Sequence, residues 1–418
     1  MTEFSGGCLN GSFKAPPSKS YTHRAIIMAS LAKGTSTIHD PLISLDTVST
    51  MGAMEAMGAV IERQGDELKI IGNGVQIPAG APLDVGNSGT TIRLLSGIVS
   101  SFDSPVTLTG DESIQKRPMG PLLDALTGMG VSCTSNNGMP PVTIKGPNNG
   151  GEISISGDVS SQFISSLIMS APLFRNDTSV NINGSTVSRP YIDITIRMMK
   201  DFGVNVIEEG SFKIEAGQTY KPREYRVPGD MSSAAFPLVG GALSGSVTME
   251  GYDKDDPQGD KAITDILKEC GADVSVEDEK ITVSRNELNG CDIDMADIPD
   301  LFPVVAVLLS TAEGKSRLYG APHLRFKESD RILSTTRMLN TLGADITPTD
   351  DGCIINGVER LKGGKIEHLG DHRIAMSAAM ASLISDSPVT MDDTECCSVS
   401  FPGFLDTMRR MGMTICTD

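Results

Sequence analysis

The segment MKDFGVNV, Met199–Val206, carries the pattern that decides the fold. Two apolar residues three positions apart precede Gly203, and apolar and polar residues alternate after it. The first spacing predicts the last turn of a helix, which Gly commonly ends because it adopts a left-handed backbone without a Cβ clash. The alternation predicts a strand. The segment therefore predicts a helix that stops at Gly203 and leads into a strand.

The same pattern occurs five more times along the chain. Its glycines recur at intervals of 68 to 73 residues and are Gly58, Gly130, Gly203, Gly271, Gly343 and Gly412. Turn residues at 64–66 and 208–210 then predict hairpins. A solenoid is one reading of a repeat, but solenoid units usually run to roughly 20–45 residues. Six units of strand, helix and hairpin, in two groups of three with a boundary near Pro222–Gly229, fit better.

A second landmark of similar period is a polar residue at the start of an apolar run. These residues are Ser20, Ser88, Ser160, Ser232, Asp300 and His372. Ser and Asp are natural N-caps, and the apolar runs predict helices buried at the centre of each group. A helix start presents unpaired N–H groups and a positive dipole end, so it favours anions. The landmark therefore predicts anion sites.

Cations near these helix starts point the same way. Lys19 and Arg24 flank Ser20, Arg93 follows Ser88 within the same run, and Arg373 follows His372. The segment GNSGTT, Gly86–Thr91, is rich in Gly and hydroxyl groups and favours close backbone approach to a carboxylate or phosphate. For any single cation, a solvated surface charge remains the alternative.

The segment KESDR, Lys327–Arg331, precedes another helical run and holds an acid, a base and two cations. At helical spacing Lys327 and Arg331 would share a face, with Glu328 one turn from Arg331. The segment fits either a charged surface helix or an acid–base site. Asp300, at the start of an apolar helix, is the second candidate carboxylate, because a buried Asp can accept a proton.

Composition limits the class of protein. The chain has 418 residues, 39% hydrophobic and 21% charged, which fits a globular protein of two or three domains. A net charge of −18 and 4% aromatic residues argue against nucleic-acid binding. Eight scattered Cys and five His lack metal-ligand spacing, so free thiols in a reducing cytoplasm and no metal are expected. We also expect no signal peptide and no membrane span.

The motifs together are similar to those of the 5-enolpyruvylshikimate-3-phosphate synthase family. They run in order along the whole chain and are PSKSYTHR (Pro17–Arg24), GNSGTTIR (Gly86–Arg93), KRPM (Lys116–Met119), SSQF (Ser160–Phe163), SRPYID (Ser188–Asp193), IPD (Ile298–Asp300), FKESDR (Phe326–Arg331), GDHRIAM (Gly370–Met376) and SFPGF (Ser400–Phe404). The resemblance implies a mixed α/β fold of two similar domains, residues 17–228 and residues 1–16 with 229–418. Each would hold three βαβαββ units about a pseudo-threefold axis, with buried central helices and the active site in the interdomain cleft.

The resemblance also implies a reaction. The enolpyruvyl group of phosphoenolpyruvate would move to the 5-hydroxyl of shikimate 3-phosphate, with release of phosphate, in the shikimate pathway to chorismate and aromatic amino acids. Acid–base chemistry and positioning suffice for this step, so no cofactor is expected. The implied partners are two small anionic substrates rather than a nucleic acid or a membrane, and the implied state is a cytoplasmic monomer.

Matching the motifs residue by residue assigns a role to each position. Shikimate 3-phosphate would be bound by Lys19, Ser20, Arg24, Ser160, Ser161, Gln162, Ser188, Tyr191, Asp300 and Lys327. Phosphoenolpyruvate would be bound by Lys19, Gly89, Arg117, Gln162, Arg331 and Arg373. The catalytic residues would be Asp300, Glu328, Lys327 and Lys19. In this scheme Asp300, assisted by Lys327, accepts the 5-hydroxyl proton, and Glu328 protonates the methylene carbon.

Three positions depart from the family pattern. His23 and His323 stand where the family has Asn. Val399 stands where the family often has Lys, so one phosphoenolpyruvate contact is absent or supplied elsewhere. These departures bear on substrate affinity more than on the type of reaction.

Two alternatives remain open at this point. The related UDP-N-acetylglucosamine enolpyruvyl transferases share the fold and the donor, but they have Asn at the position of Ser20. They also usually carry a Cys in the segment corresponding to Asp111–Met119, which has none. The second alternative is a non-catalytic repeat scaffold, which gives no reason for Asp300, Lys327 and Glu328 at their positions.

Overall fold

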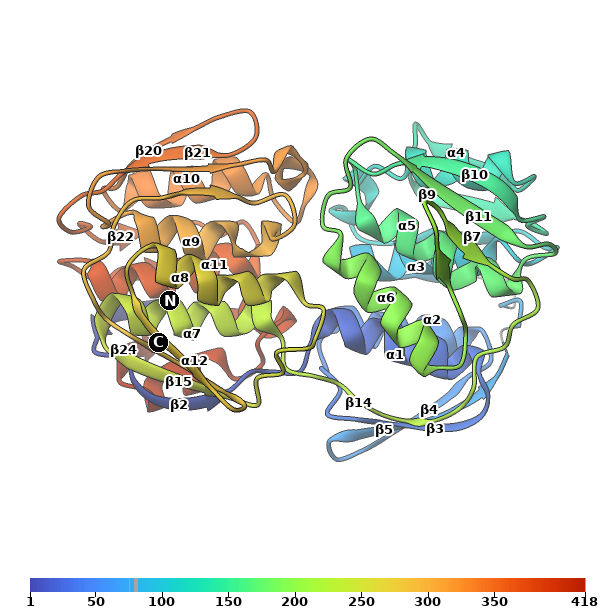
Figure 1. Ribbon diagram of the computed structural model, residues 1–418, viewed down its shortest axis with the longest axis horizontal. Helices are drawn as coiled ribbons and strands as arrows, with labels where there is room; N and C mark the ends of the chain where they lie inside the picture. The colour runs from blue at the N-terminus through green and yellow to red at the C-terminus, as the bar shows by residue number, and fades with distance from the viewer. Residues whose placement is uncertain (75, 79–81, 418) are drawn as a thin grey trace. The chain divides into compact units, whose positions relative to one another are not determined.

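The structure is a computed structural model that describes residues 1–74, 76–78 and 82–417 (Figure 1). The chain divides into two compact units. Unit 1 is Met1–Pro16 with Gly229–Asp418, and unit 2 is Pro17–Pro228. The described residues of each unit contain three four-stranded sheets, which makes the architecture mixed α/β, as the repeat predicted.

The sheets of unit 2 share one topology. In the second of them, β6 (Leu83–Asp84) runs parallel to β7 (Val106–Thr109), which pairs antiparallel with β9 (Met139–Lys145). β8 (Ser132–Asn136) forms a hairpin with β9 and completes the sheet. The other two sheets follow the orders β14–β3–β5–β4 and β10–β11–β13–β12. Their strands are β3 (Lys33–His39), β4 (Val60–Gln64), β5 (Glu67–Asn73), β10 (Gly151–Ser156), β11 (Thr178–Asn183), β12 (Ile207–Glu208), β13 (Phe212–Ile214) and β14 (Glu224–Arg226).

Unit 1 repeats this topology, with two strands supplied by the start of the chain. β1 (Thr2–Gly7) pairs antiparallel with β23 and β24, and β2 (Asn10–Lys14) runs parallel to β15. The sheet orders are β16–β17–β15–β2, β18–β19–β21–β20 and β22–β23–β1–β24. Their other strands are β15 (Ser246–Glu250), β16 (Asp273–Glu277), β17 (Lys280–Ser284), β18 (Asp292–Asp294), β19 (Lys315–Tyr319), β20 (Asp345–Pro348), β21 (Cys353–Asn356), β22 (Gly364–Lys365), β23 (Val389–Met391) and β24 (Met413–Thr417).

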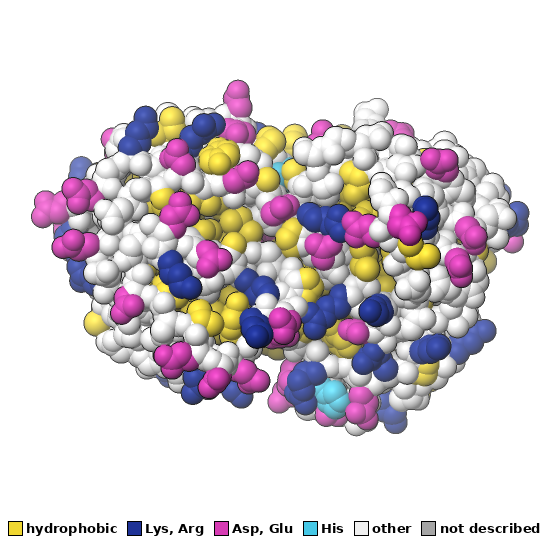
Figure 2. Space-filling view, in the orientation of Figure 1, with side chains coloured by type: hydrophobic (Ala, Val, Ile, Leu, Met, Phe, Trp, Pro, Cys, Tyr) yellow, Lys and Arg dark blue, Asp and Glu magenta, His cyan; other side chains and the backbone are white. Residues whose placement is uncertain are grey.

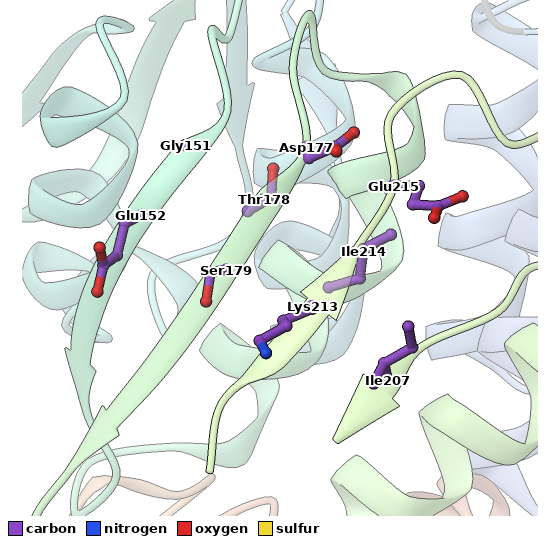
Figure 3. Close-up of a pocket in the computed structure, with 9 residues that line it drawn as sticks. All are labelled: Gly151, Glu152, Asp177, Thr178, Ser179, Ile207, Lys213, Ile214 and Glu215. Atoms are coloured by element: carbon purple, nitrogen blue, oxygen red, sulfur yellow. The ribbon is translucent and has the colours of Figure 1, made fainter. Parts of the chain in front are cut away.

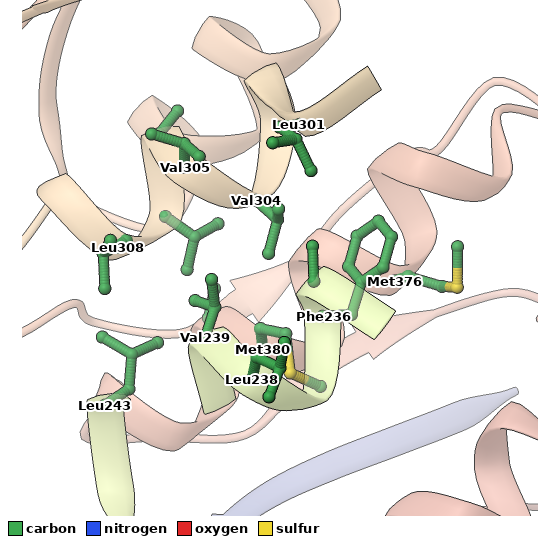
Figure 4. Close-up of a cluster of buried hydrophobic side chains, with 14 of the residues drawn as sticks. Phe236, Leu238, Val239, Leu243, Leu301, Val304, Val305, Leu308, Met376 and Met380 are labelled. Atoms are coloured by element: carbon green, nitrogen blue, oxygen red, sulfur yellow. The ribbon is translucent and has the colours of Figure 1, made fainter. Parts of the chain in front are cut away.

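Three apolar helices form the centre of each unit, as the apolar runs predicted. They are α1 (Lys19–Leu31), α3 (Gly89–Val99) and α5 (Ser161–Ser170) in unit 2, and α7 (Met231–Ser244), α9 (Phe302–Leu309) and α11 (His372–Ala381) in unit 1. Figure 4 shows Val239 of α7, Val304 of α9 and Met380 of α11 packed together in the core of unit 1. Helix α9 is buried on every side because it is apolar on every side. Helix α7 contains serines but is buried from Met231 to Leu243.

The outer helix of each repeat ends as the glycine pattern predicted. These helices are α2 (Leu45–Ala56), α4 (Gly120–Gly128), α6 (Pro190–Asp201), α8 (Ile263–Glu269), α10 (Arg331–Thr341) and α12 (Phe404–Arg410). The six repeated glycines that follow them have φ between +82° and +105°, a left-handed backbone that residues with a Cβ rarely adopt. The hairpins at 64–66 and 208–210 are also present, between β4 and β5 and between β12 and β13.

The helix starts are placed correctly to within two residues, but not every cap is the one predicted. Ser88 and Ser160 do cap α3 and α5 through their side chains. The N-cap of α1 is Ser18 and that of α7 is Asp230, so Ser20 and Ser232 lie inside the first turn. An apolar run shows where a helix is buried, but not which of several polar residues stops the helical backbone.

The surface of each unit carries mixed charge. Figure 2 shows basic and acidic side chains interspersed on the visible faces of both units. Within the described residues, no helix combines the length and apolar character that a membrane crossing requires.

Candidate active site

Two arginines and three carboxylates meet in unit 1, and we call Asp300, Glu328, Arg331, Asp371 and Arg373 the carboxylate–arginine cluster. Arg331 donates to Asp300 at 2.7 Å, to Glu328 at 2.6 Å and to Asp371 at 2.9 Å. Arg373 donates to the other oxygen of Asp300 at 2.9 Å. The Arg331 side chain is only 1% exposed, so these charges interact with little solvent screening.

Three helix starts bring this cluster together. Asp300 lies in the 3-10 helix η4 (Pro299–Leu301), directly before α9. Arg331 is the first residue of α10, and Asp371 caps α11 by accepting from the backbone N–H of Arg373. Asp300, Arg331 and Asp371 lie at the starts of α9, α10 and α11, so their side chains meet where these three helices begin.

The expected shared helical face of Lys327 and Arg331 is wrong. The 3-10 helix η5 (Pro322–Phe326) ends before Lys327, and the backbone is not helical again until Arg331. Asp330 caps α10 by accepting from the N–H of Leu333, which sets the start of the helix at the last residue of the polar segment. The predicted Glu328–Arg331 pair is nevertheless present.

Electrostatics keep Asp300 ionised. Burial by itself would raise the pKa of this carboxyl, but Arg373, Arg331 and Lys327 outweigh it and hold the pKa far below the ordinary value. The neighbouring carboxylates have the opposite effect on the pKa of Arg331. Burial would lower its pKa, yet Asp371, Glu328 and Asp300 raise it above the ordinary value.

Two further buried groups belong to the surroundings of Asp300. Asp260, in the 3-10 helix η3 (Gly259–Ala262), accepts a hydrogen bond from Ser232. Burial and the charge of Asp300 raise the pKa of Asp260 to about 7. Burial and Lys327 lower the pKa of His323 to about 3, so its imidazole is neutral at physiological pH. Positive charge near Asp300 is thus carried by Arg331, Arg373 and Lys327, and not by His323.

In unit 2, the start of α1 holds Lys19 and Arg24 in different ways. Lys19 donates to Asp46 of α2 at 3.0 Å and is 15% exposed. Arg24 is buried and donates to Thr195 at 2.8 Å and to the carbonyl of Tyr191 at 3.2 Å. Burial lowers the pKa of Arg24 to about 10, so it stays charged at neutral pH. Lys19 is therefore the more accessible cation, and Arg24 ties α1 to α6.

The start of α3 is shaped by a glycine. A Cβ built at Gly89 would lie 2.4 Å from Nη1 of Arg117, closer than atoms can approach. Arg117 follows the 3-10 helix η1 (Ile114–Lys116) and donates to the side chain of Asn87 at 3.0 Å. Gly89 thus leaves room for the Arg117 guanidinium beside the start of α3.

The start of α5 presents two hydroxyls and an amide. Ser160 caps the helix, and Ser161 and Gln162 occupy its first turn. The Gln162 amide accepts from Arg93 at 2.7 Å and donates to Thr90 at 2.9 Å, which fixes its orientation. Gln162 therefore connects the starts of α3 and α5.

Ser188 lies just before α6, and Tyr191 lies within its first turn. Ser188 is buried and has φ +55°, a strained conformation for a residue with a Cβ. Tyr191 lies in the first turn of α6, and its carbonyl accepts from Arg24. Ser188 is therefore held beside the α6 start rather than on an exposed surface loop.

A hydrogen-bonded chain of buried side chains joins α1 to the N-cap of α3, and it begins at His23, one of the departures from the family pattern. His23 contacts Thr50 at 2.7 Å, Thr50 contacts Thr91 at 2.6 Å, and Thr91 contacts Ser88 at 2.6 Å. Burial, followed by the charges of Lys19 and Arg24, holds the pKa of His23 well below its ordinary value. A neutral His23 thus supports the N-cap of α3.

Several residues of these clusters lie outside the sequence-based prediction. Asp371 pairs with Arg331, Asp46 pairs with Lys19, and Asn87 accepts a hydrogen bond from Arg117. Arg93 stands near a helix start in the sequence, but the motifs assign it no substrate. The usable signal was the position of Asp371 directly before the helix that starts with His372, where an N-cap is expected.

A surface hollow elsewhere in unit 2 has no link to these clusters. It has a volume of about 390 Å³ and lies on β10, β11 and β13 (Figure 3). Glu152, Ser179 and Lys213 line it, and none of its lining residues is a predicted site residue. Within the described part of the chain, no group of three or more His, Cys, Asp or Glu could hold a metal ion.

Comparison with known proteins places the chain in a family. A sequence model described as EPSP synthase (3-phosphoshikimate 1-carboxyvinyltransferase) matches residues 5–408. A protein of Methanocorpusculum labreanum named 3-phosphoshikimate 1-carboxyvinyltransferase is 48% identical over 97% of this chain and 96% of its own length. The chain belongs to the EPSP synthase family. A protein of the same name from Methanothermobacter thermautotrophicus is 43% identical over 99% of this chain and 98% of its own length.

The fold of this chain is similar to that of a solved EPSP synthase. The enzyme from Acinetobacter baumannii superimposes with a TM-score of 0.84 at 33% identity, covering 100% of this chain and 99% of that chain. The expected family and mixed α/β fold are therefore confirmed. Family membership also selects this transferase over a UDP-N-acetylglucosamine transferase and over a non-catalytic scaffold.

Proposed function

We propose that this member of the EPSP synthase family transfers the enolpyruvyl group of phosphoenolpyruvate to the 5-hydroxyl of shikimate 3-phosphate. The observation that carries the proposal is the carboxylate–arginine cluster, in which Asp300 is held between Arg331 and Arg373. A carboxylate beside two guanidinium groups combines a proton acceptor with a receptor for an anionic donor. Both are needed when an alcohol attacks phosphoenolpyruvate.

The unit 2 residues supply binding for the phosphorylated acceptor. Ser160, Ser161 and Ser188 offer hydroxyls at helix starts, where a phosphate is stabilised by N–H groups and the helix dipole. Ser20 and Lys19 offer a hydroxyl and a charge at the start of α1. Gln162 joins this group, and Tyr191 lines the ring of the acceptor.

The proposed cations for phosphoenolpyruvate are Arg117, Lys19, Arg331 and Arg373. Gly89 leaves room for Arg117, and Lys19 contacts both substrates. Guanidinium groups bind carboxylate and phosphate oxygens in pairs, which fixes the donor for attack. Arg24, which is buried among protein acceptors, holds the acceptor site together through α1 and α6.

Asp300 changes basicity as the donor binds. Its pKa without substrate is too low for efficient proton abstraction, because two arginines surround it. When the anionic donor takes up hydrogen bonds from Arg331 and Arg373, the positive charge felt by Asp300 falls and its pKa rises. Asp300, with Lys327 beside it, then accepts the 5-hydroxyl proton, and Glu328 protonates the methylene carbon.

The experiment is the variant Asp300→Asn. It keeps the shape of the side chain but removes the proton acceptor, so turnover should fall by roughly two to four orders of magnitude. Shikimate 3-phosphate binding, measured by calorimetry, should change only a few-fold. The exposed Asp292→Asn serves as the matched control and should leave both quantities unchanged. Near-normal turnover in Asp300→Asn would remove the proposed base.

The setting of the enzyme is also part of the proposal. All eight cysteines are free thiols, which supports a reducing compartment such as the cytoplasm. The proposed substrate contacts all come from one chain, so a monomer holds a complete set. Sedimentation at assay concentration tests the monomer, and a dimer as the active species would overturn it.

A further inference from the structure

A thiol, an imidazole and a carboxylate meet in unit 1 outside the residues assigned to the reaction. Cys396 Sγ lies 3.5 Å from His368 Nδ1. His368 Nε2 lies 3.7 Å from Asp393 Oδ2. The order of the three groups is nucleophile, base and carboxylate, the arrangement that activates a thiol toward an electrophile.

The hydrogen bonds around His368 set its tautomer. The backbone N–H of Gly370 donates to Nδ1 at 3.1 Å, so that nitrogen is an acceptor in the neutral ring. The other nitrogen, Nε2, then carries the proton and faces Asp393. Nδ1 also lies 3.5 Å from the Cys396 sulfur, so it can take the proton of Cys396 in exchange for the hydrogen bond from Gly370. Asp393 then stabilises the imidazolium that results.

The backbone holds this arrangement in place. Cys396 lies in the 3-10 helix η7 (Glu395–Val399), which packs against α11. His368 is followed by Leu369 and Gly370, whose φ values of +54° and +72° form a tight left-handed turn. The His368 side chain is 11% exposed, and Cys396 is partly exposed, so this residue lies near the protein surface.

We propose that Cys396 is a modification site, at which the thiolate forms a mixed disulfide with a low-molecular-weight disulfide. The Cys396 sulfur attacks one sulfur of RSSR, a new S–S bond forms and the RS–SR bond breaks. The leaving RS⁻ takes the proton that His368 received from Cys396, so RSH is released. The Cys396 sulfur is oxidised to a disulfide sulfur and the leaving sulfur of RSSR is reduced to a thiol, so the electrons balance without another oxidant.

The charge environment supports this assignment. A hydrogen bond from Cys397, reinforced by His368, lowers the pKa of Cys396 to about 6, against the opposing effects of burial and of the Asp393 charge. In turn, Cys396 raises the pKa of His368. A thiol that is largely ionised at neutral pH reacts faster than an ordinary exposed thiol.

Modification would reach the carboxylate–arginine cluster through one short segment. His368 contacts the N–H of Gly370, and the next residue, Asp371, caps α11 and holds Arg331. A group bound to Cys396 displaces His368 and releases this turn. The consequence, which rests on the proposed function, is weaker phosphoenolpyruvate binding with shikimate 3-phosphate binding retained.

The chain provides its own control for reactivity. Cys8 and Cys416 are exposed, whereas Cys396 is only half-exposed. If access alone decided the rate, Cys8 and Cys416 would react first. If the His368 and Asp393 contacts decide it, Cys396 reacts first.

The test is peptide mass spectrometry of the whole enzyme during reaction with hydroxyethyl disulfide at pH 7. We expect Cys396 to be modified at least tenfold faster than Cys8 and Cys416. Cys396→Ser should remove that product, which assigns it to Cys396 rather than Cys397. His368→Asn and the surface variant Asp393→Asn should slow it, and Asp393→Asn provides the result if His368→Asn fails to fold. A faster Cys8 or Cys416, or an unchanged rate in the folded variants, would overturn the site.

A second measurement tests the consequence for activity. Modified enzyme should show a several-fold higher KM for phosphoenolpyruvate, reversed by dithiothreitol, and Cys396→Ser should be active and insensitive. Complete modification with an unchanged KM would overturn the link to Arg331. Mass spectrometry tests the modification site, and the activity of the untreated enzyme tests the proposed function. A failure of one claim can therefore be told from a failure of the other.

Discussion

At the scale of single residues, the absence of one Cβ makes room for a side chain of the proposed binding site. Gly89 lies under the guanidinium of Arg117, and an added methyl group would meet its Nη1 at 2.4 Å. Since that atom is the end of a flexible side chain, Arg117 would move while the backbone stayed in place. The substitution should therefore affect binding more than stability.

The prediction for Gly89→Ala is a KM for phosphoenolpyruvate raised by about tenfold, with the melting temperature nearly unchanged. Steady-state kinetics and thermal unfolding check it. Gly120→Ala is the matched control, because a Cβ at Gly120 meets nothing within 4 Å. An unchanged KM in Gly89→Ala would mean that Arg117 does not contact the donor.

Glu328 is expected to have a different role from Asp300, although both contact Arg331. Glu328→Gln cannot donate a proton to carbon, so turnover should fall by roughly two to four orders of magnitude. It should also lose hydrogen exchange at the methylene group of phosphoenolpyruvate, measured by NMR in deuterated water. Retained exchange with slow turnover would place Glu328 in binding rather than in proton transfer.

At the scale of elements, helix ends determine both the fold and the position of the residues assigned to the reaction. Gly58 follows α2 with φ +93°, whereas Gly52 lies exposed inside the same helix. Gly58→Ala places a Cβ on a left-handed backbone and should lower the free energy of unfolding by about 1–2 kcal/mol. Gly52→Ala improves helix propensity and should stabilise it by up to about 1 kcal/mol. Denaturant unfolding checks both values, and equal signs would contradict the role of Gly58.

The fold was predictable because its signals are local. Each repeated glycine follows a helix and precedes a strand, and a window of about eight residues contains all of that information. The caps at Ser18 and Asp230 were missed by two residues because nearby polar residues offer equally good caps. The predicted helix at Lys327 was wrong for the same reason, since Asp330 caps α10 and the helix begins only at Arg331.

The site was predictable only in part. Lys19, Ser161 and Arg331 do lie in the first turns of helices, whereas Lys327 and Glu328 lie in the non-helical segment before α10. Their partners could not be read from the sequence, because Asp46 is 27 residues from Lys19 and Asp371 is 40 residues from Arg331. Such contacts depend on tertiary packing, and local spacing carries no record of them. The roles assigned to individual substrate-binding residues stay predictions.

At the scale of the whole molecule, a net charge of −18 opposes the local cations. At about 0.01 M salt the Debye length of roughly 30 Å lets the overall charge repel anionic substrates, and at about 0.15 M it shrinks to roughly 8 Å. The buried arginines are screened far less. We therefore expect kcat/KM for phosphoenolpyruvate to hold or rise over this range. A fall of tenfold or more would indicate steering by an exposed positive surface.

The most direct test of the proposed transfer is a product measurement with two acceptors. Enzyme, phosphoenolpyruvate and shikimate 3-phosphate are mixed, and phosphate and enolpyruvyl product are quantified together. We expect one phosphate for each molecule of 5-enolpyruvylshikimate 3-phosphate formed, and no product from UDP-N-acetylglucosamine. Phosphate without that product, or product from UDP-N-acetylglucosamine alone, would contradict the proposed transfer.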